Sequence, residues 1–136
     1  MLSIDEKYNL VLDARSRSYS PYSNFAVGAL CILNDDTVIK GCNVENMSYG
    51  LAMCAERNAI FSSITQGYNY KDIKEIVIIA DTEKPVSPCG ACRQVMAEFL
   101  SPDTKITMFN LRKEHLVMKL EELLPYSFDK GDLDDK

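Results

Sequence analysis

Residues 87–94, SPCGACRQ, place two cysteines two residues apart directly after a proline. A Cys-x-x-Cys pair can be a redox couple, half of a zinc site or a pair of buried side chains. The proline and the apolar spacing after it predict a helix from about Cys89 to Leu100, with Cys92 on its inner face. Both sulfur atoms would then lie in the first turn, where free N–H groups and the helix dipole favour thiolates.

A third cysteine opens a second predicted helix. The stretch CAERNA (54–59) follows a loop, and the pattern after it predicts a helix from near Cys54 to Gly67. Together with Cys89 and Cys92, Cys54 would give a zinc ion three thiolate ligands. Because zinc prefers four ligands, one position would stay open to water, which is typical of catalytic rather than structural zinc sites.

Glu56, two positions after Cys54, indicates a class of reaction. A carboxylate beside an activated water can take its proton and pass it to a leaving group. Three thiolates would give the metal site a net negative charge, and this weakens zinc as a Lewis acid. We therefore expect a compensating cation, with Arg57 as the first candidate and Arg93 as the alternative.

The remaining patterns predict an α/β layered domain with a mixed sheet. Ser3 and Glu6 form a capping box for a first helix that fades near Ser18. The NDD stretch (34–36) is typical of a hairpin turn, so the two strands that flank it should be antiparallel. Strands are expected at 25–33, 37–44, 74–80, 105–110 and, more weakly, 115–119, with a short last helix at 120–125.

The composition limits the possible partners and the compartment. The chain has 136 residues, enough for one domain, and a net charge of −5 with 15 scattered basic residues, which argues against binding a polynucleotide. The N-terminus lacks the pattern of a signal peptide, and no apolar run approaches the ~20 residues of a membrane span. Five cysteines, an odd number, favour reduced thiols. We therefore expect a cytoplasmic protein that binds a small molecule and neither nucleic acid nor membrane.

Three segments together resemble the small homotetrameric cytidine deaminases of pyrimidine salvage. They are YSPYSNFAVGA (19–29), GCNVENMSYGLAMCAERNAI (41–60) and PCGACRQVMAEF (88–99). The likeness extends from about residue 5 to Phe128 and is in register throughout. It implies a three-layer α/β/α domain with a mixed five-stranded sheet, a single domain over 1–136 of which about 129–136 form an acidic tail, and a homotetramer with shared active sites.

The resemblance also assigns roles to the two motifs. Cys54, Cys89 and Cys92 would hold one zinc ion per chain, and Glu56 would be the proton shuttle rather than a ligand. Water would attack C4 of cytosine while Glu56 protonates N3. Loss of ammonia would then convert cytidine to uridine and deoxycytidine to deoxyuridine.

The same resemblance implies a set of substrate-binding residues. Asn43 and Glu45 match positions that hydrogen-bond the ribose, which suits an amide and a carboxylate. Phe25 matches a residue that stacks on the base, and the backbone of Ala55 one that contacts it. Tyr49 is also expected to bind substrate, and Phe128 to reach in from a neighbouring subunit.

Other functions remain open at this point. A related zinc deaminase could act on another aminopyrimidine nucleoside such as blasticidin S. A nucleic-acid deaminase is disfavoured by the acidic composition and by Cys54, where tRNA-adenosine enzymes have histidine. A non-enzymatic zinc module would not need Glu56 and would keep a fourth protein ligand. Cys31 and Cys42 are expected to be small buried hydrophobes, and His115, the one histidine, to lie in a polar loop or at a strand end.

Overall fold

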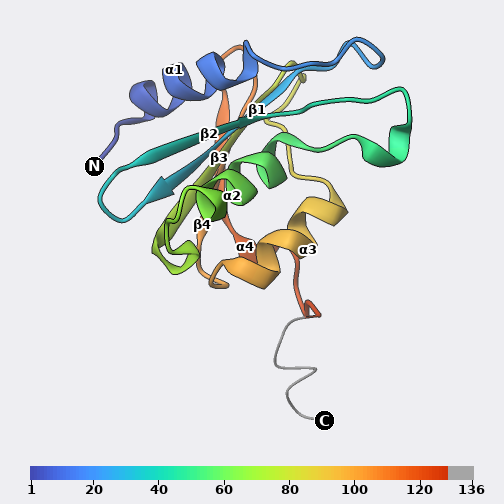
Figure 1. Ribbon diagram of the computed structural model, residues 1–136. Coiled ribbons are helices and arrows are strands. Elements are labelled where there is room, and N and C mark those ends of the chain that lie inside the picture. Colours follow the sequence, from blue (N-terminus) through green and yellow to red (C-terminus); the bar gives the residue numbers. More distant parts are fainter. Residues whose placement is uncertain (129–136) are drawn as a thin grey trace.

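A mixed five-stranded sheet runs through the middle of the molecule in the order β2-β1-β3-β4-β5 (Figure 1). The computed structural model describes residues 1–128, so the expected acidic tail at 129–136 lies outside the described residues. Only β3 and β4 are parallel; the other neighbouring strands are antiparallel, which confirms the predicted opening hairpin. The strands are β1 (Val27–Leu33), β2 (Val38–Cys42), β3 (Ile73–Ala80), β4 (Lys105–Phe109) and β5 (His115–Lys119).

Helices cover both faces of this sheet and confirm the expected three layers (Figure 1). Helix α1 lies on one face, and α2, α3 and α4 lie on the other. Their bounds are α1 (Ile4–Arg15), α2 (Ala55–Thr65), α3 (Gly90–Phe99) and α4 (Leu120–Leu123), and two short 3-10 helices, η1 (Tyr49–Leu51) and η2 (Tyr70–Asp72), lie in the connections.

The alternation of side chains along β3 divides the core between the two layers. Val77 and Ile79 pack against Val11 of α1, whereas Ile76 and Ile78 face the side covered by α2 and α3. Successive side chains of a strand point to opposite faces, so a strand that is apolar at nearly every position must be covered twice.

Gly41 lets α2 approach β2 directly. A Cβ atom at this position would lie 2.5 Å from the carbonyl oxygen of Ala55 and 2.5 Å from the backbone nitrogen of Ala59. Any larger residue would push α2 away from the sheet. The first turn of α2, which follows Cys54, is therefore seated against the strand by backbone contact.

Most of the expected elements are present, with shifted ends. The capping box of Ser3 and Glu6 is confirmed, but α1 ends at Arg15 rather than near Ser18. The first strand begins at Val27, so Phe25 precedes it. Cys54 and Cys89 are the N-cap residues of α2 and α3 and not their first helical residues.

The segment 115–119, expected to be a weak strand, pairs with β4 over five residue pairs. Among the described residues, no helix combines the length and the apolar character needed to cross a bilayer.

Candidate active site

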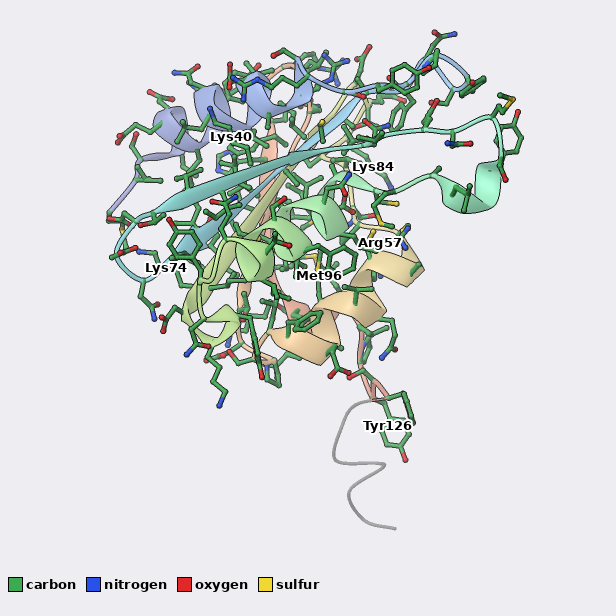
Figure 2. All side chains as sticks on the ribbon, viewed as in Figure 1. Lys40, Arg57, Lys74, Lys84, Met96 and Tyr126 are labelled. Carbon is green, nitrogen blue, oxygen red and sulfur yellow. The ribbon has the colours of Figure 1, made fainter. Side chains whose placement is uncertain are left out.

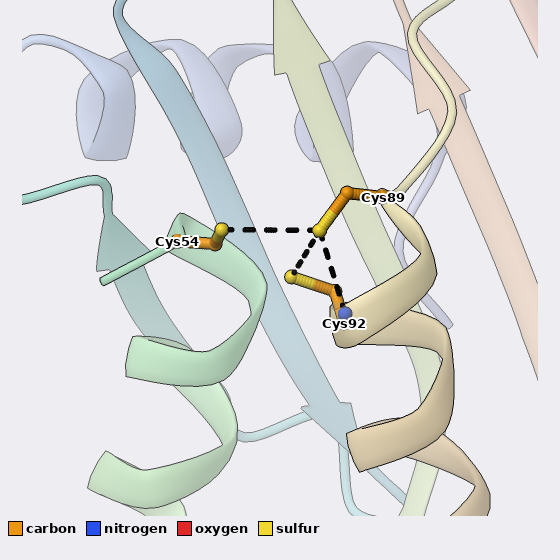
Figure 3. A group of neighbouring side chains, drawn as sticks. All are labelled: Cys54, Cys89 and Cys92. Atoms are coloured by element: carbon orange, nitrogen blue, oxygen red, sulfur yellow. Dashed lines mark hydrogen bonds between the residues drawn. The ribbon is translucent and has the colours of Figure 1, made fainter. Parts of the chain in front are cut away.

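Three cysteine thiols meet where α2 and α3 begin (Figure 3). The sulfur of Cys89 lies 4.0 Å from that of Cys54 and 3.3 Å from that of Cys92, and all three lie within 4.8 Å of one another. Zinc–sulfur bonds of ~2.3 Å in a tetrahedron separate sulfur atoms by roughly 3.8 Å. The spacing of the three sulfur atoms therefore fits one zinc ion.

Two of the three thiols differ in the direction in which their pKa is shifted. The hydrogen bond from Cys92 is the largest cause that lowers the pKa of Cys54 to about 5, and the Arg57 guanidinium adds to it. The pKa of Cys92 is raised, first by the same hydrogen bond and then by burial. Without a metal, Cys54 is thus the thiolate and Cys92 keeps its proton. Zinc binds thiolates, so Cys54 is ready to bind the ion, whereas Cys92 would have to release its proton when zinc binds.

The two arginines proposed as compensating cations have different contacts. The Arg57 guanidinium donates from one Nη to the sulfur of Cys54 at 3.2 Å, and Figure 2 shows it where α2 and α3 begin. Its Nε is buried without a hydrogen-bond partner. Arg93 donates instead to the backbone carbonyls of Pro88 and Leu123, at 2.8 and 2.6 Å. Of the two, Arg57 is therefore the one in contact with a cluster sulfur.

Glu56 lies beside the cluster at the bottom of a cavity. Its side chain is 5% exposed, and burial raises the pKa of its carboxyl group. The cavity has a volume of about 220 Å³, and its wall includes the ligand candidates Cys54 and Cys89. We refer to it as the zinc cavity. Phe25, Asn43 and Ala55, three of the expected substrate residues, also line it.

Asn43 is held by an almost complete set of hydrogen bonds. Its Oδ1 accepts from the Ser18 hydroxyl at 2.5 Å and from the Val27 N–H at 2.9 Å. Its Nδ2 donates to the carbonyl of Phe25 at 2.8 Å. A primary amide has two N–H donors, so one donor of Asn43 is left for a ligand.

Glu45 lines a second cavity, of about 260 Å³, together with Tyr49. One carboxylate oxygen accepts the N–H groups of Tyr22 and Ser23, both at 3.1 Å, and the other accepts the Ser23 hydroxyl. The hydrogen bond from the Ser23 hydroxyl is the largest cause that lowers the pKa of this carboxyl group. Because a carboxylate can accept about four hydrogen bonds, Glu45 retains roughly one acceptor position.

Phe128 lines neither cavity. Its side chain is 58% exposed, and its backbone carbonyl accepts a hydrogen bond from the Gln94 side chain at 2.6 Å. The connection from β2 to α2 also exposes large apolar side chains, among them Met47, Tyr49 and Leu51.

The other cysteines and the histidine lie outside the site. Cys31 is fully buried, and burial raises the pKa of its thiol to about 12, as expected for an inert core residue. Cys42 is only half-buried, so its expected burial was overestimated. It lies at the end of β2, where the strand leaves the core. His115 is the first residue of β5, at a strand end as expected, and its ring contacts Phe109.

Sequence reasoning missed two serines that form hydrogen bonds with the expected substrate-binding residues. Ser18 binds Asn43, and Ser23 binds Glu45. Both lie in the loop before β1, and Ser23 is part of the quoted segment 19–29. Ser23 lies two residues after the turn proline Pro21, which was the available signal, but its partner Glu45 lies 22 residues away in the chain.

The fold and the site define a class of protein. An α/β/α domain that gathers three thiols at two helix N-termini, next to a buried carboxylate and an open cavity, is built as a zinc enzyme with one free metal position. The family model described as "Cytidine and deoxycytidylate deaminase zinc-binding region" matches residues 3–108. The chain therefore belongs to the cytidine and deoxycytidylate deaminase family.

Individual relatives agree with this assignment. A cytidine deaminase of Halalkalibacterium halodurans is 47% identical over 124 residues, which are 91% of this chain and 92% of that protein. A cytidine deaminase of Sporosarcina psychrophila is 44% identical over 88% of this chain and 87% of its own length. The crystal structure of a cytidine deaminase from Burkholderia pseudomallei superposes with a TM-score of 0.90 at 42% identity, covering 93% of this chain and all of that one (100%).

Proposed function

We propose that the protein hydrolytically deaminates free cytidine and deoxycytidine, giving uridine and deoxyuridine and releasing ammonia. The observation that carries this proposal is the position of Glu56, a buried carboxylate at the bottom of a cavity whose wall holds cysteines of the three-thiol cluster. Relatives of the same length that are named cytidine deaminases support the choice of substrate.

Cys54, Cys89 and Cys92 would hold the zinc ion through their sulfur atoms. When bound there, zinc would lower the pKa of a water molecule and so supply the nucleophile at neutral pH. The contact between Arg57 and the Cys54 sulfur supports a role for Arg57 in offsetting the negative charge of the thiolates. Among the described residues no fourth side chain joins the cluster, which leaves room for this water.

Glu56 would move the protons of the reaction. It takes a proton from the attacking water and gives it to N3 of the cytosine ring as C4 becomes tetrahedral. It then transfers the second proton of the water to the amino group, which leaves as ammonia. Burial favours the protonated form of Glu56, so its carboxyl group can hold a proton between these steps.

The remaining donor of Asn43 and the remaining acceptor of Glu45 would bind the sugar. A hydroxyl group can donate to Glu45 and accept from Asn43, and both nucleosides carry the 3′-hydroxyl. Phe25 would stack on the base, the backbone of Ala55 would contact it, and Tyr49 would complete the pocket. A phosphate backbone would meet an acidic protein of net charge −5, so we propose a free nucleoside rather than a polynucleotide.

Ammonia release from the zinc-loaded protein tests this function. We expect turnover of cytidine and deoxycytidine, and none of a cytosine-containing oligonucleotide. Turnover of blasticidin S in place of cytidine would assign the protein to a different aminopyrimidine, and turnover of none of the four substrates would leave a zinc-stabilised module.

We further propose a homotetramer with shared active sites, acting in pyrimidine salvage in the cytoplasm. The exposed Met47, Tyr49 and Leu51 support an association between subunits, because monomers seldom expose several large apolar side chains within one short segment, and Phe128 is a further exposed aromatic residue. All five cysteines are free thiols, which suits a reducing compartment.

Mixed tetramers test whether Phe128 enters a neighbouring site. Glu56→Ala subunits lack the proton shuttle and keep Phe128, and Phe128→Ala subunits have the reverse. When the two are refolded together, some sites should combine Glu56 of one chain with Phe128 of another. Activity above the sum of the separate variants would support sharing; activity equal to that sum would exclude it.

A further inference from the structure

The Ser23 hydroxyl connects two residues of the proposed substrate site. Its oxygen accepts a hydrogen bond from the backbone N–H of Phe25 at 3.0 Å, and its hydrogen is donated to the carboxylate of Glu45. A hydroxyl has one hydrogen to donate, so that hydrogen is fully used by Glu45. The Ser23 hydroxyl therefore has no hydrogen left to donate to a ligand. It can influence a bound ligand only through its partners Glu45 and Phe25.

Both backbone polar groups of Phe25 form hydrogen bonds with side chains, the N–H with Ser23 and the carbonyl with Asn43. The Ser23 hydroxyl accepts a hydrogen bond from the Phe25 N–H, and the Asn43 side-chain amide donates one to the Phe25 carbonyl at 2.8 Å. Asn24, the residue before it, has a φ of 57°, a left-handed conformation that few residues other than glycine adopt readily. The position of the Phe25 backbone before β1 thus depends on hydrogen bonds from the side chains of Ser23 and Asn43.

We propose that Ser23 is a positioning residue that couples recognition of the sugar to placement of the base. The proposal rests on the function proposed above, in which Glu45 binds a sugar hydroxyl and Phe25 stacks on cytosine. A ligand hydroxyl that takes the last acceptor position of Glu45 fixes the carboxylate, the carboxylate fixes Ser23, and Ser23 fixes the backbone of Phe25. Binding at the sugar end then orders the ring at the base end.

Removing the hydroxyl breaks this connection without disturbing the core. Ser23→Ala leaves the Phe25 N–H and one oxygen of Glu45 without their partner, whereas Asn43 still holds the Phe25 carbonyl. Ser23 is exposed, so both freed groups reach water and the variant is expected to fold. Ser23→Thr keeps a hydroxyl at the same position and should restore the connection.

A comparison of two substrates distinguishes coupling between the sugar and base sites from an effect of Ser23 on the base site alone. Cytidine offers Glu45 the 3′-hydroxyl, whereas 2′,3′-dideoxycytidine lacks that group and keeps only its 5′-hydroxyl. For Ser23→Ala we expect kcat/KM for cytidine to fall about tenfold, mostly through KM, because one hydrogen bond to a charged group is lost. The loss for dideoxycytidine should be about threefold or less, since this ligand lacks the 3′-hydroxyl proposed to bind Glu45.

The matched controls are Ser23→Thr and Ser16→Ala. Ser23→Thr should stay within about twofold of the wild type on both substrates. Ser16 is an exposed serine whose hydroxyl donates to the Asp13 carbonyl at 2.6 Å and to no other group within residues 1–128, and its replacement should leave both values unchanged. Equal losses on both substrates, or no loss for Ser23→Ala on cytidine, would overturn the proposal.

Hydrogen exchange of the Phe25 amide tests the role of Ser23 independently of enzymatic activity. If the wild type releases no ammonia from cytidine, the proposed function fails, and the Phe25 amide then decides the role of Ser23. Its exchange should be at least about fivefold faster in Ser23→Ala than in the wild type, because the amide has lost its acceptor. An unchanged exchange rate would overturn the proposal even in an active enzyme.

Discussion

Glu56 on α2 and Glu75 on β3 are 5% and 2% exposed, and they lie on opposite faces of one sheet. The carboxylate of Glu75 binds the ammonium group of Lys7 through both oxygens, at 2.9 and 3.0 Å, and accepts the Thr107 hydroxyl at 2.5 Å. Within the described part of the chain, Glu56 forms no ion pair, and its carboxylate lines the zinc cavity.

The difference in bonded partners indicates different roles for Glu75 and Glu56. A buried charge costs several kcal/mol unless partners compensate it, so Glu75 with its full set of partners holds α1 to the sheet. For Glu56, burial is the largest influence and raises the pKa of the carboxyl group, although a hydrogen bond from its own backbone, a hydrogen bond with Cys92 and the charge of Arg57 act in the opposite direction. Titratable groups in a cavity whose pKa is shifted by burial are typical of functional sites.

The largest effect is expected from the metal ligands on the Glu56 side. Cys92→Ala should lose both zinc and turnover, because two thiolates remain where three are needed. The loss of stability should reach ~4 kcal/mol when free zinc exceeds its Kd about 1,000-fold. Zinc analysis and urea unfolding measure both. Cys42 lies outside the cluster, so the control variant Cys42→Ala should keep its zinc. Retention of zinc by Cys92→Ala would refute the assignment of Cys92 as a ligand.

Replacing Glu75, the paired buried acid, should change the stability of the protein and not its activity. Glu75→Gln leaves the buried Lys7 ammonium uncompensated and should lower the free energy of unfolding by ~3–5 kcal/mol. The protein that remains folded should deaminate cytidine at the wild-type rate. Urea unfolding at a fixed protein concentration gives the first value and a turnover assay the second. The double variant Lys7→Met, Glu75→Leu should recover most of the stability; a persistent loss would mean that the ion pair is not its cause.

This contrast also explains what the sequence could predict. The cysteine motifs, Glu56 and the capping box of Ser3 and Glu6 depend on residues within a few positions of one another, and the structure brings the three cysteines together. Alternation of apolar residues was enough to predict the strands and their coverage by helices on both sides.

Long-range partners could not be predicted in this way. Lys7 meets Glu75 across 68 positions, so a lysine within the apolar stripe of α1 gave no sign of its burial. Phe25 was placed in a strand by its apolar neighbours. Its carbonyl is instead bound by the Asn43 side chain, 18 positions away, and the strand begins two residues later. Tertiary hydrogen bonds decided both cases.

Arg57 offers a smaller effect on the Glu56 side. Arg57→Gln removes the charge that contacts the Cys54 sulfur, so turnover should fall about tenfold while zinc stays bound. Steady-state kinetics and metal analysis on the same sample measure this. Arg17→Gln, a change at an exposed arginine paired with Asp13, is the control and should leave turnover unchanged. An unchanged rate for Arg57→Gln would show that the compensating charge lies elsewhere.

The smallest effect is expected at an exposed ion pair of the far end of the sheet, where Figure 2 shows Lys74 well away from Arg57. Lys74 and the N-terminal ammonium lower the pKa of Asp36 to about 2, below its value of ~3.9 in an unfolded chain. Asp36 therefore stabilises the protein above pH ~4, and this contribution is lost as the pH falls toward about 2.

Asp36→Asn should accordingly lower Tm slightly at pH 7, and the difference from the wild type should shrink below pH ~4. Thermal unfolding of both proteins at each pH removes the effect of metal loss, which is common to both. A difference that grows as the pH falls would contradict the assignment.

The most direct test of the contrast between the two acids is zinc content and cytidine turnover measured on the same preparation of Glu56→Ala. We predict one zinc per chain, a free energy of unfolding within about 1 kcal/mol of the wild type, and turnover reduced at least 10²- to 10⁴-fold, roughly the contribution of a general acid–base group. Loss of zinc together with Glu56 would show that this carboxylate is a ligand, and turnover near the wild-type rate would show that it is not the proton shuttle.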